Sequence, residues 1–337
     1  MRQQSTIMLF FEHNMIKDIP SSDDFIASGE DFLNMAWDNI FDLLFQHTKI
    51  KASSDLNDEE DNEDIDNKYW KKVKPYLSTS LVLIQQGNEF LLKGHIVKKS
   101  PYLILTDDWY NGKNKDRSFS ELKTIEASNL IKVYNAVIDP PLTPLTDKFE
   151  QEVFKKLKDK RNTIMHSVPK NLDIEYKDLL INILEISQQL IGKRSWIKTR
   201  KKFLENQSYI RRTDDELKKA HILLEIATEI DHVIELLGES LLTEYFGISD
   251  KTQYWYLCPH CYKAFELLKN TLENYNEKIT KRAQLKPKGQ NTDKLYCLLC
   301  DQTSKVGREK CNCEGCPGNV ISDSGICMTC GNKFDES

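Results

Sequence analysis

The cysteines constrain the fold of this chain more than any other feature. All nine lie after residue 257 of a chain of 337 residues. Eight of them form four C-x-x-C pairs, which are Cys258/Cys261, Cys297/Cys300, Cys313/Cys316 and Cys327/Cys330. One tight turn of such a pair presents two thiolates to a metal ion, and Zn²⁺ prefers four thiolates in a tetrahedron. The sequence therefore predicts a C-terminal module built around two structural zinc ions per chain.

The pairing of the four motifs is open from the sequence. The first two pairs are separated by 35 residues, enough for a helical insertion, and the last two by ten. Pairing in chain order gives two ribbon-like sites, whereas pairing the first motif with the third and the second with the fourth gives a cross-braced module. Cys311 is left over and could replace Cys313 as a ligand. Because all the expected ligands are cysteines, the sites look closed, and no catalytic metal is expected.

Before the cysteines, apolar residues recur at the three-to-four spacing of a helix. Phe25, Leu33, Trp37 and Ile40 illustrate this in the first fifty residues. Similar stripes predict helices near residues 78–96, 120–136, 146–168, 176–191 and 213–241. The expected fold class is all-α, a helical bundle over residues 1–200 followed by a small zinc-ribbon module over 251–337. A helical extension over 201–250 joins the two.

The acidic residues are concentrated in one segment. Asp55–Asp66 holds eight acids in twelve residues and no base. Outside that segment 47 basic residues face 44 acidic ones, so the net charge of −5 does not exclude a nucleic-acid partner. We interpret residues 52–67 as a solvated acidic loop. The alternative is a mimic of nucleic acid that covers a basic site.

Compartment and membrane contact are predicted from apolar runs. The longest are short, such as Ile7–Phe11, far below the roughly 18 residues that cross a bilayer. The first residues carry an acid and a histidine directly after this run, which does not fit a signal peptide. We expect a cytoplasmic protein with no membrane partner.

A second motif lies at the end of the helix expected near residues 146–168. It reads Arg161-Asn162-Thr163-Ile164-Met165-His166, with Pro169 close behind. Asn162 and His166 are four apart and share a helix face, so the Asn162 amide is expected to orient the imidazole. A helix C-terminus favours a protonated imidazole, which suits acid–base chemistry near neutral pH. Arg161 offers a permanent cation that suits a phosphate.

This motif resembles the signature of HEPN domains (higher eukaryotes and prokaryotes nucleotide-binding). That signature is Arg, a polar residue that is often Asn, three more residues and His, near the end of a helix in an all-α bundle. Leu81–Leu105 and Phe119–Val137 also resemble segments of bacterial HEPN proteins. The resemblance covers about residues 78–191. It does not cover the later long helix or the cysteine-rich module.

The resemblance implies an activity and a set of partners. Many HEPN proteins are metal-independent endoribonucleases of bacterial toxin and defence systems. On this basis Arg161, Asn162 and His166 would cut RNA through its 2′-OH, leaving 2′,3′-cyclic phosphate and 5′-OH ends. HEPN domains typically pair, so a homodimer is implied, with an antitoxin or another defence protein as a further partner. Other HEPN proteins are inactive and only bind RNA or dimerise.

A basic segment is a second candidate for contact with RNA. Residues 192–203 hold six bases, no acid and Trp196. The bases are expected to contact phosphates while the indole stacks on a nucleobase; they are Lys193, Arg194, Lys198, Arg200, Lys201 and Lys202. The alternative is a solvated loop with a partly buried tryptophan. A second basic stretch, residues 278–288, lies among the cysteines. One further alternative is a zinc-ribbon regulator whose helical part serves only for dimerisation.

Overall fold

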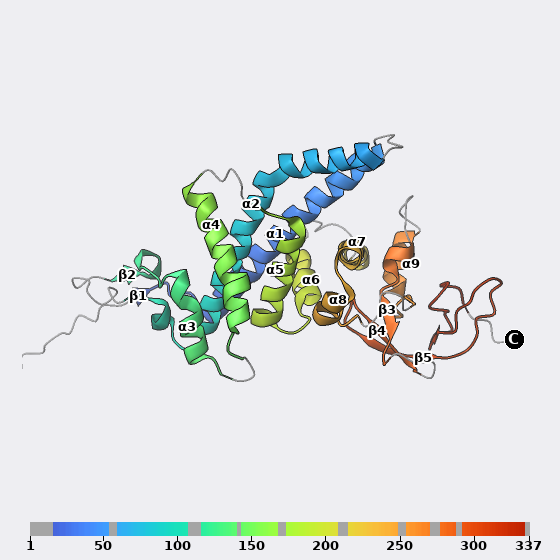
Figure 1. Ribbon diagram of the computed structural model, residues 1–337. Helices are drawn as coiled ribbons and strands as arrows, with labels where there is room; N and C mark the ends of the chain where they lie inside the picture. The colour runs from blue at the N-terminus through green and yellow to red at the C-terminus, as the bar shows by residue number, and fades with distance from the viewer. Residues whose placement is uncertain are drawn as a thin grey trace, which may run out of the picture. The chain divides into compact units, whose positions relative to one another are not determined.

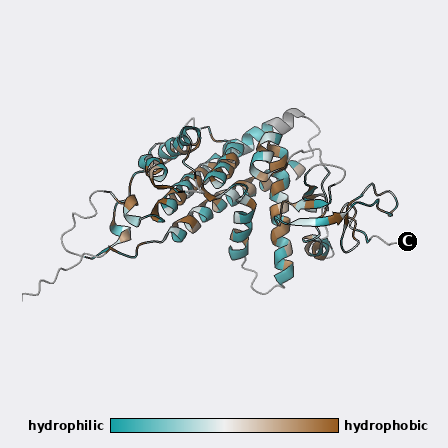
Figure 2. Ribbon diagram, turned by 90° about the horizontal axis from the view of Figure 1, so that it is seen from below, coloured by the Kyte–Doolittle hydropathy of each residue, from teal (hydrophilic) through white to brown (hydrophobic). Residues whose placement is uncertain are grey.

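The computed structural model describes residues 16–53, 59–106, 116–139, 143–167, 173–207, 215–248, 254–269, 277–287 and 292–333. The chain divides into two compact units, Met1–Ile183 and Leu184–Ser337. The ribbons of the long helices alternate between hydrophilic and hydrophobic colours in Figure 2, as expected of helices with one apolar stripe. Within the described residues, none of the helices combines the length and the apolar character that a membrane span requires.

The first unit is built on two long helices that pack along each other (Figure 1). Helix α1 spans Ser22–Ser53 and α2 spans Glu59–Val97. A capping box begins α1. The Ser21 hydroxyl accepts a hydrogen bond from the Asp24 N–H at 3.2 Å, and the Asp24 carboxylate accepts one from the Ser21 N–H at 2.8 Å. These bonds satisfy two groups that a helix end would otherwise leave unpaired.

Glycines let α1 and α2 approach closely. A Cβ on Gly29 would lie 2.8 Å from Leu91 Cγ, and one on Gly87 would lie 3.0 Å from the Gly29 carbonyl oxygen. The side chains between the helices form the core of the unit and are almost fully buried: Leu33, Ala36, Trp37, Ile40, Leu81, Ile84, Leu91 and Leu92. The apolar periodicity of the first fifty residues therefore marked the correct face of α1.

The acidic loop expected over residues 52–67 is wrong for most of its length. Helix α1 continues to Ser53, and α2 already begins at Glu59 and contains Pro75. Carboxylates are favourable in the first turns of a helix because they face the positive end of its dipole. Asp66 also lies 2.7 Å from His47 Nε2 and 3.2 Å from Lys51 Nζ, both on α1. Burial alone would raise the pKa of Asp66, but these two partners hold it below its usual value.

Shorter elements surround the two long helices, and α3 and α4 pack on α2. They are β1 (Ile16–Lys17), η1 (Pro101–Ile104), β2 (Arg117–Ser118), η3 (Phe119–Glu121), α3 (Ala127–Val137), η4 (Phe149–Lys155), α4 (Lys156–His166) and α5 (Tyr176–Ile186). Strands β1 and β2 form a two-stranded parallel sheet. The π turns of η4 run directly into α4, and Phe149, Phe154 and Leu157 anchor this continuous rod in the core. The rod thereby holds the Arg161–His166 segment beside α2.

The second unit combines helices with a small sheet (Figure 1). Its helical elements are η5 (Ser187–Ile191), α6 (Trp196–Gln207), α7 (Asp215–Leu236), α8 (Glu239–Phe246), α9 (Tyr262–Lys269) and α10 (Glu277–Thr280). Its strands are β3 (Ala283–Leu285), β4 (Lys294–Cys297), β5 (Thr303–Gly307) and β6 (Ile321–Ser322). The strands pair in chain order and antiparallel, so neighbours in the sequence are neighbours in the sheet.

The expected all-α class holds only in part. The chain is mainly helical, but the cysteine-rich part carries a four-stranded antiparallel sheet, and the short β1–β2 pair lies before it. The division between the two compact units falls inside α5, between Ile183 and Leu184. Helices α6 to α8 group with the cysteine-rich module, because α7 packs against α9 and α10 as well as α6.

Candidate functional site

The first cysteine cluster contains Cys258, Cys261, Cys297 and Cys300, whose sulfur atoms lie within 4.8 Å of one another. Cys258 and Cys261 form a turn at the start of α9, closed by hydrogen bonds from the Cys261 and Tyr262 N–H groups to the Cys258 carbonyl. Cys297 ends β4, and Cys300 lies in the turn before β5. The cluster therefore pairs the first motif with the second, across an insertion that holds α9, α10 and β3.

Its sulfur–sulfur distances fit a tetrahedral metal site. Cys258 and Cys300 are 3.6 Å apart, and Cys261 and Cys297 are 4.0 Å apart. A zinc–sulfur bond of about 2.3 Å gives a tetrahedron whose edge is about 3.8 Å. A disulfide would need about 2.05 Å, and all nine cysteines are free. The geometry is compatible with one structural zinc ion.

The ionisation of these thiols points the same way. Hydrogen bonds within the cluster lower the pKa of Cys258 and Cys300 and raise that of Cys261 and Cys297. Four thiolates in one buried cluster repel one another and cannot ionise together in the absence of a cation. A bound Zn²⁺ supplies that cation, which is why metal binding and folding are coupled in such modules.

The second cluster contains Cys311, Cys316, Cys327 and Cys330. Cys311 lies 3.8 Å from Cys330 and Cys316 lies 3.9 Å from Cys327, sulfur to sulfur, again close to a tetrahedral edge. Gly318 leaves room for the site, because a Cβ there would lie 2.9 Å from the Cys327 sulfur. Together the two clusters give the two four-cysteine sites that the sequence predicts, paired in chain order and not cross-braced.

One ligand differs from the expectation. The cluster includes Cys311 and leaves out Cys313. Cys311, which belongs to none of the four C-x-x-C pairs, therefore takes the place of the predicted ligand Cys313. The physical reason lies in the backbone of this loop. The Cys313 N–H donates to the Cys311 sulfur at 3.4 Å, and its carbonyl accepts from the Cys316 N–H at 3.1 Å, so Cys313 supports its neighbours through its main chain. Its own thiol is half-buried.

Main-chain and side-chain bonds join the two clusters. The Leu257 N–H donates to the Met328 carbonyl at 2.7 Å, and the Tyr262 hydroxyl donates to the Gly331 carbonyl at 2.7 Å. Leu257 and Tyr262 flank the first C-x-x-C turn, whereas Met328 and Gly331 belong to the last. The two sites therefore form one structural block.

The Arg–His motif lies at the C-terminal end of α4, where His166 is the last helical residue. The Arg161 guanidinium donates to Glu89 Oε1 on α2 at 3.0 Å and to Asn162 Oδ1 at 3.0 Å. Glu89 is nearly buried and also accepts from the Gln85 amide at 3.1 Å, so the arginine is held against a fixed carboxylate. Some 28% of the Arg161 side chain stays exposed.

His166 and Asn162 do not form the expected pair. His166 is exposed, and among the described residues none forms a hydrogen bond with its side chain. Asn162 instead accepts from Arg161, because the guanidinium lies next to it in the sequence and presents its donors on the α2 side. The expected role of Asn162 in orienting the imidazole is therefore not seen, and Pro169 lies outside the described residues.

Glu89 is the residue at this site that the motif itself does not contain. It lies 72 positions before Arg161 and reaches it because α4 packs on α2. The sequence signal for Glu89 is its position among apolar residues at helical spacing. Such a position predicts burial, and a buried carboxylate needs a partner. The sequence does not say which base that partner is.

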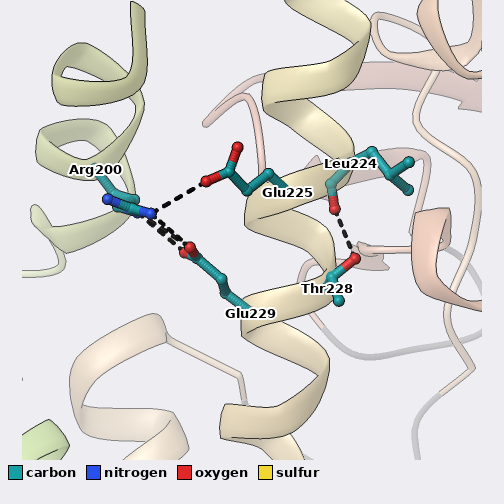
Figure 3. Close-up of polar contacts among 5 residues, drawn as sticks. All are labelled: Arg200, Leu224, Glu225, Thr228 and Glu229. Atoms are coloured by element: carbon teal, nitrogen blue, oxygen red, sulfur yellow. Dashed lines mark hydrogen bonds and ion pairs between the residues drawn. The ribbon is translucent and has the colours of Figure 1, made fainter. Parts of the chain in front are cut away.

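The basic segment expected to bind RNA is divided by the structure. Arg200 is buried on α6 and forms an ion pair with Glu229 on α7, with guanidinium-to-carboxylate distances of 2.7 and 3.2 Å, while Glu225 lies 3.3 Å away (Figure 3). Trp196 is 2% exposed and belongs to the core of the second unit. Neither side chain can reach RNA, so the predictions for Arg200 and Trp196 are wrong.

The remaining bases of that segment stay at the surface. Lys193, Arg194, Lys198 and Lys202 are exposed, and Lys201 is half-buried near Glu205 on the same helix. The reason for the division is helical periodicity. Residues 196–207 form a helix with one buried face, and positions 196, 200 and 203 fall on it. Contact of the exposed bases with RNA stays a prediction.

Comparisons with known proteins add no relative. A scan of protein-family models and searches of the curated proteins and of the solved structures found no match to this chain. The resemblance to HEPN domains rests on the sequence motifs alone.

Proposed function

We propose that this protein is a metal-independent endoribonuclease that uses Arg161 and His166, with a C-terminal module held by two structural zinc ions. The observation that carries the proposal is the motif at the end of α4. It offers a cation anchored by Glu89 at 3.0 Å and an exposed imidazole five residues further on. A fixed guanidinium and an exposed imidazole near the end of one helix suit phosphate chemistry.

The proposed reaction uses the substrate's own nucleophile. The 2′-oxygen of a ribose attacks the adjacent phosphorus while a base takes its proton. The bond from phosphorus to the 5′-oxygen breaks, and an acid protonates the departing oxygen. The products are a 2′,3′-cyclic phosphate and a 5′-OH. Arg161 stabilises the charge that grows on the phosphoryl oxygens.

Acid and base are two tasks for one histidine per motif. A homodimer that brings two motifs together supplies both groups, one His166 from each chain. Light scattering at micromolar concentration should therefore give the mass of a dimer. A monomer that cleaves RNA at full rate would contradict this arrangement.

The donor set at the motif favours a route without Mg²⁺. That ion takes an octahedron of oxygen ligands, usually with one or two protein carboxylates and the substrate phosphate. Among the residues that the structure describes, Glu89 is the carboxylate in contact with the motif, and it already forms an ion pair with Arg161. Omission of magnesium should leave the cleavage rate unchanged.

The direct test compares single variants. Arg161→Ala and His166→Ala should each abolish cleavage of single-stranded RNA, while His221→Ala should cleave normally, because His221 is an exposed histidine on α7. Asn162→Ala should reduce the rate less. Deoxy substrates should resist. Products with 5′-phosphate ends, or full activity of His166→Ala, would disprove the proposal.

A toxic effect on a bacterial host would connect this activity to defence. We propose that expression of the intact chain slows growth and that His166→Ala relieves the effect, as expected of a toxin or an antiviral component. If both chains are equally harmless, a defence role is not supported.

One observation favours a second candidate, an inactive adaptor that binds RNA or dimerises. Glu89 neutralises part of the charge that Arg161 would offer to a phosphate. In that case Arg161 serves the packing of α4 on α2, and the chain binds RNA without cutting it. The variants above separate the two candidates, because only the first requires product formation.

A further inference from the structure

One face of the sheet in the cysteine-rich module carries a row of three lysines in register, and this face is exposed at β4 and β5. Lys294 on β4 lies directly opposite Lys305 on β5. Lys286 follows β3 and is in register with Lys294, since its N–H donates to the Lys294 carbonyl at 3.0 Å. Directly opposed side chains on neighbouring strands have Cβ atoms about 4.5–5.5 Å apart. Lys294 and Lys305 thus lie side by side on neighbouring strands, and the Lys286 backbone is in register with them just after β3.

The row is electrostatically unfavourable by itself. Like charges directly opposite each other destabilise a sheet. Lys294 and Lys305 are exposed and form no ion pair with any residue that the structure describes. Lys286 donates to the Gly247 carbonyl at 2.7 Å, and burial together with nearby Arg194 lowers its pKa. A polyanion laid across the strands would relieve this repulsion.

Aromatic rings border the same row. Tyr296 lies on the same face of β4 as Lys294, and Lys286 Nζ lies 4.3 Å from the centre of its ring. Trp255 is half-exposed, and its indole lies 5.7 Å from the guanidinium carbon of Arg282, which fixes it. The acid on this face is Asp301, which accepts a hydrogen bond from the Tyr296 hydroxyl at 2.8 Å.

These rings line a small recess beside the lysines. Its volume is only about 10 Å³, room for about one water molecule, with Phe246, Trp255, Lys286 and Tyr296 among its walls. Sites for whole small molecules are usually about 300–1,000 Å³. The recess is too small for a cofactor or a base, so a base can contact these rings only at their exposed parts.

From this juxtaposition we propose that the β3–β4–β5 face binds single-stranded RNA. Phosphates lie along the exposed Lys294 and Lys305, and a base stacks on the half-exposed ring of Trp255. Basic grooves with aromatic platforms bind single strands in this manner without strong sequence preference. The inference rests on the proposed function in one respect, the choice of RNA as the bound strand. If both hold, the β3–β4–β5 face binds the substrate before it is cleaved.

The test measures binding where cleavage is impossible. The full, zinc-loaded chain is titrated with a fluorescent single-stranded 2′-O-methyl oligoribonucleotide, which has no free 2′-OH to react. Lys294→Glu/Lys305→Glu should weaken binding at least about tenfold. The salt dependence should drop by about 1.4 in log–log slope, about 0.7 for each phosphate that a lysine no longer neutralises.

A matched control separates this face from general charge. Lys132→Glu/Lys148→Glu makes the same charge change at exposed positions of α3 and the segment before η4. It should change affinity less than about twofold, as expected of charges that only contribute to long-range attraction.

Three outcomes would overturn the inference. These are unchanged binding in the Lys294/Lys305 variant, an equal loss in the control, or loss only in Lys198→Glu/Lys202→Glu on α6. Zinc content confirms that each variant is folded, and Lys294→Gln/Lys305→Gln replaces the glutamate version if zinc is lost. Failure of oligonucleotide binding leaves the His166 test untouched, whereas intact binding without any cleavage contradicts only the proposed reaction.

Discussion

Arg200 and Glu229 show how much one buried pair can fix. Their side chains are 2% and 3% exposed and meet at 2.7 Å, between α6 and α7. Removal of one partner from such a pair typically costs about 3–5 kcal/mol, because the other charge stays buried without compensation. The pair also selects one register of α6 on α7, since a shifted helix would bury an unpaired guanidinium.

The choice between Cys311 and Cys313 gives a prediction for single residues. Cys311→Ser should lower the zinc content of the purified chain from two ions to about one, since it removes a ligand of the second cluster. Cys313→Ser should keep two ions, because Cys313 lies outside the four-cysteine cluster and bonds to its neighbours through its main chain. Elemental analysis of the two variants decides the matter, and the reverse result would restore Cys313 as the ligand.

At the scale of elements, the crossing of α1 and α2 depends on small residues. Gly29, Gly87 and Gly94 all lie in helices, where glycine is normally unfavourable by about 1 kcal/mol relative to alanine. Each faces an atom of the other helix within 3.0 Å of an added Cβ. The close approach of the two backbones therefore explains why glycines occupy these helix positions, although glycine has a low helix propensity.

Gly29→Ala should destabilise the first unit despite the better helix propensity of alanine. The new methyl would lie 2.8 Å from Leu91 Cγ and 3.0 Å from the Gly87 carbonyl oxygen. Overpacking of this kind costs about 1–3 kcal/mol, so thermal unfolding followed by circular dichroism should begin several degrees lower. A rise in the melting temperature would show that the helices can separate at no cost.

Periodicity predicted the elements better than their ends. The stripe through Leu33, Trp37 and Ile40 identified α1 and its buried face, and C-x-x-C spacing identified two metal-compatible clusters. Composition misled at residues 59–67, where acids suggested a loop although Asp66 pairs with α1. The prediction for Arg200 was wrong for a related reason. Local composition shows a basic residue, but the ion pair with Glu229 on α7 depends on how two helices pack.

The motif at α4 was predictable only in part. The spacing of Arg161 and His166 predicts them as a candidate pair, which stays a prediction, whereas the contact of Glu89 with Arg161 depends on the packing of two helices far apart in the sequence. The lysine row was equally hidden. Lys286, Lys294 and Lys305 meet only through strand register, and register follows from turns and side-chain faces that local composition does not specify.

For the molecule as a whole, metal removal should affect the two units differently. The first unit contains no cysteine, and its core is the apolar contact of α1 with α2. A strong chelator should release two zinc ions and unfold the region after residue 254, which is poor in apolar residues, while most of the helical signal at 222 nm persists. Collapse of the entire helical signal together with zinc release would contradict this separation.

The hydrogen bonds from Leu257 to Met328 and from Tyr262 to Gly331 also suit an order of assembly in which the first cysteine site forms before the second. The first site is complete once residue 300 leaves the ribosome, but the second needs residue 330. A first site that binds zinc before the second is complete would present its Leu257 N–H and Tyr262 hydroxyl before Met328 and Gly331 are in place. These two groups would then serve as a template on which the last turn assembles. Zinc supply at that stage would decide whether the second site forms on the first or folds alone.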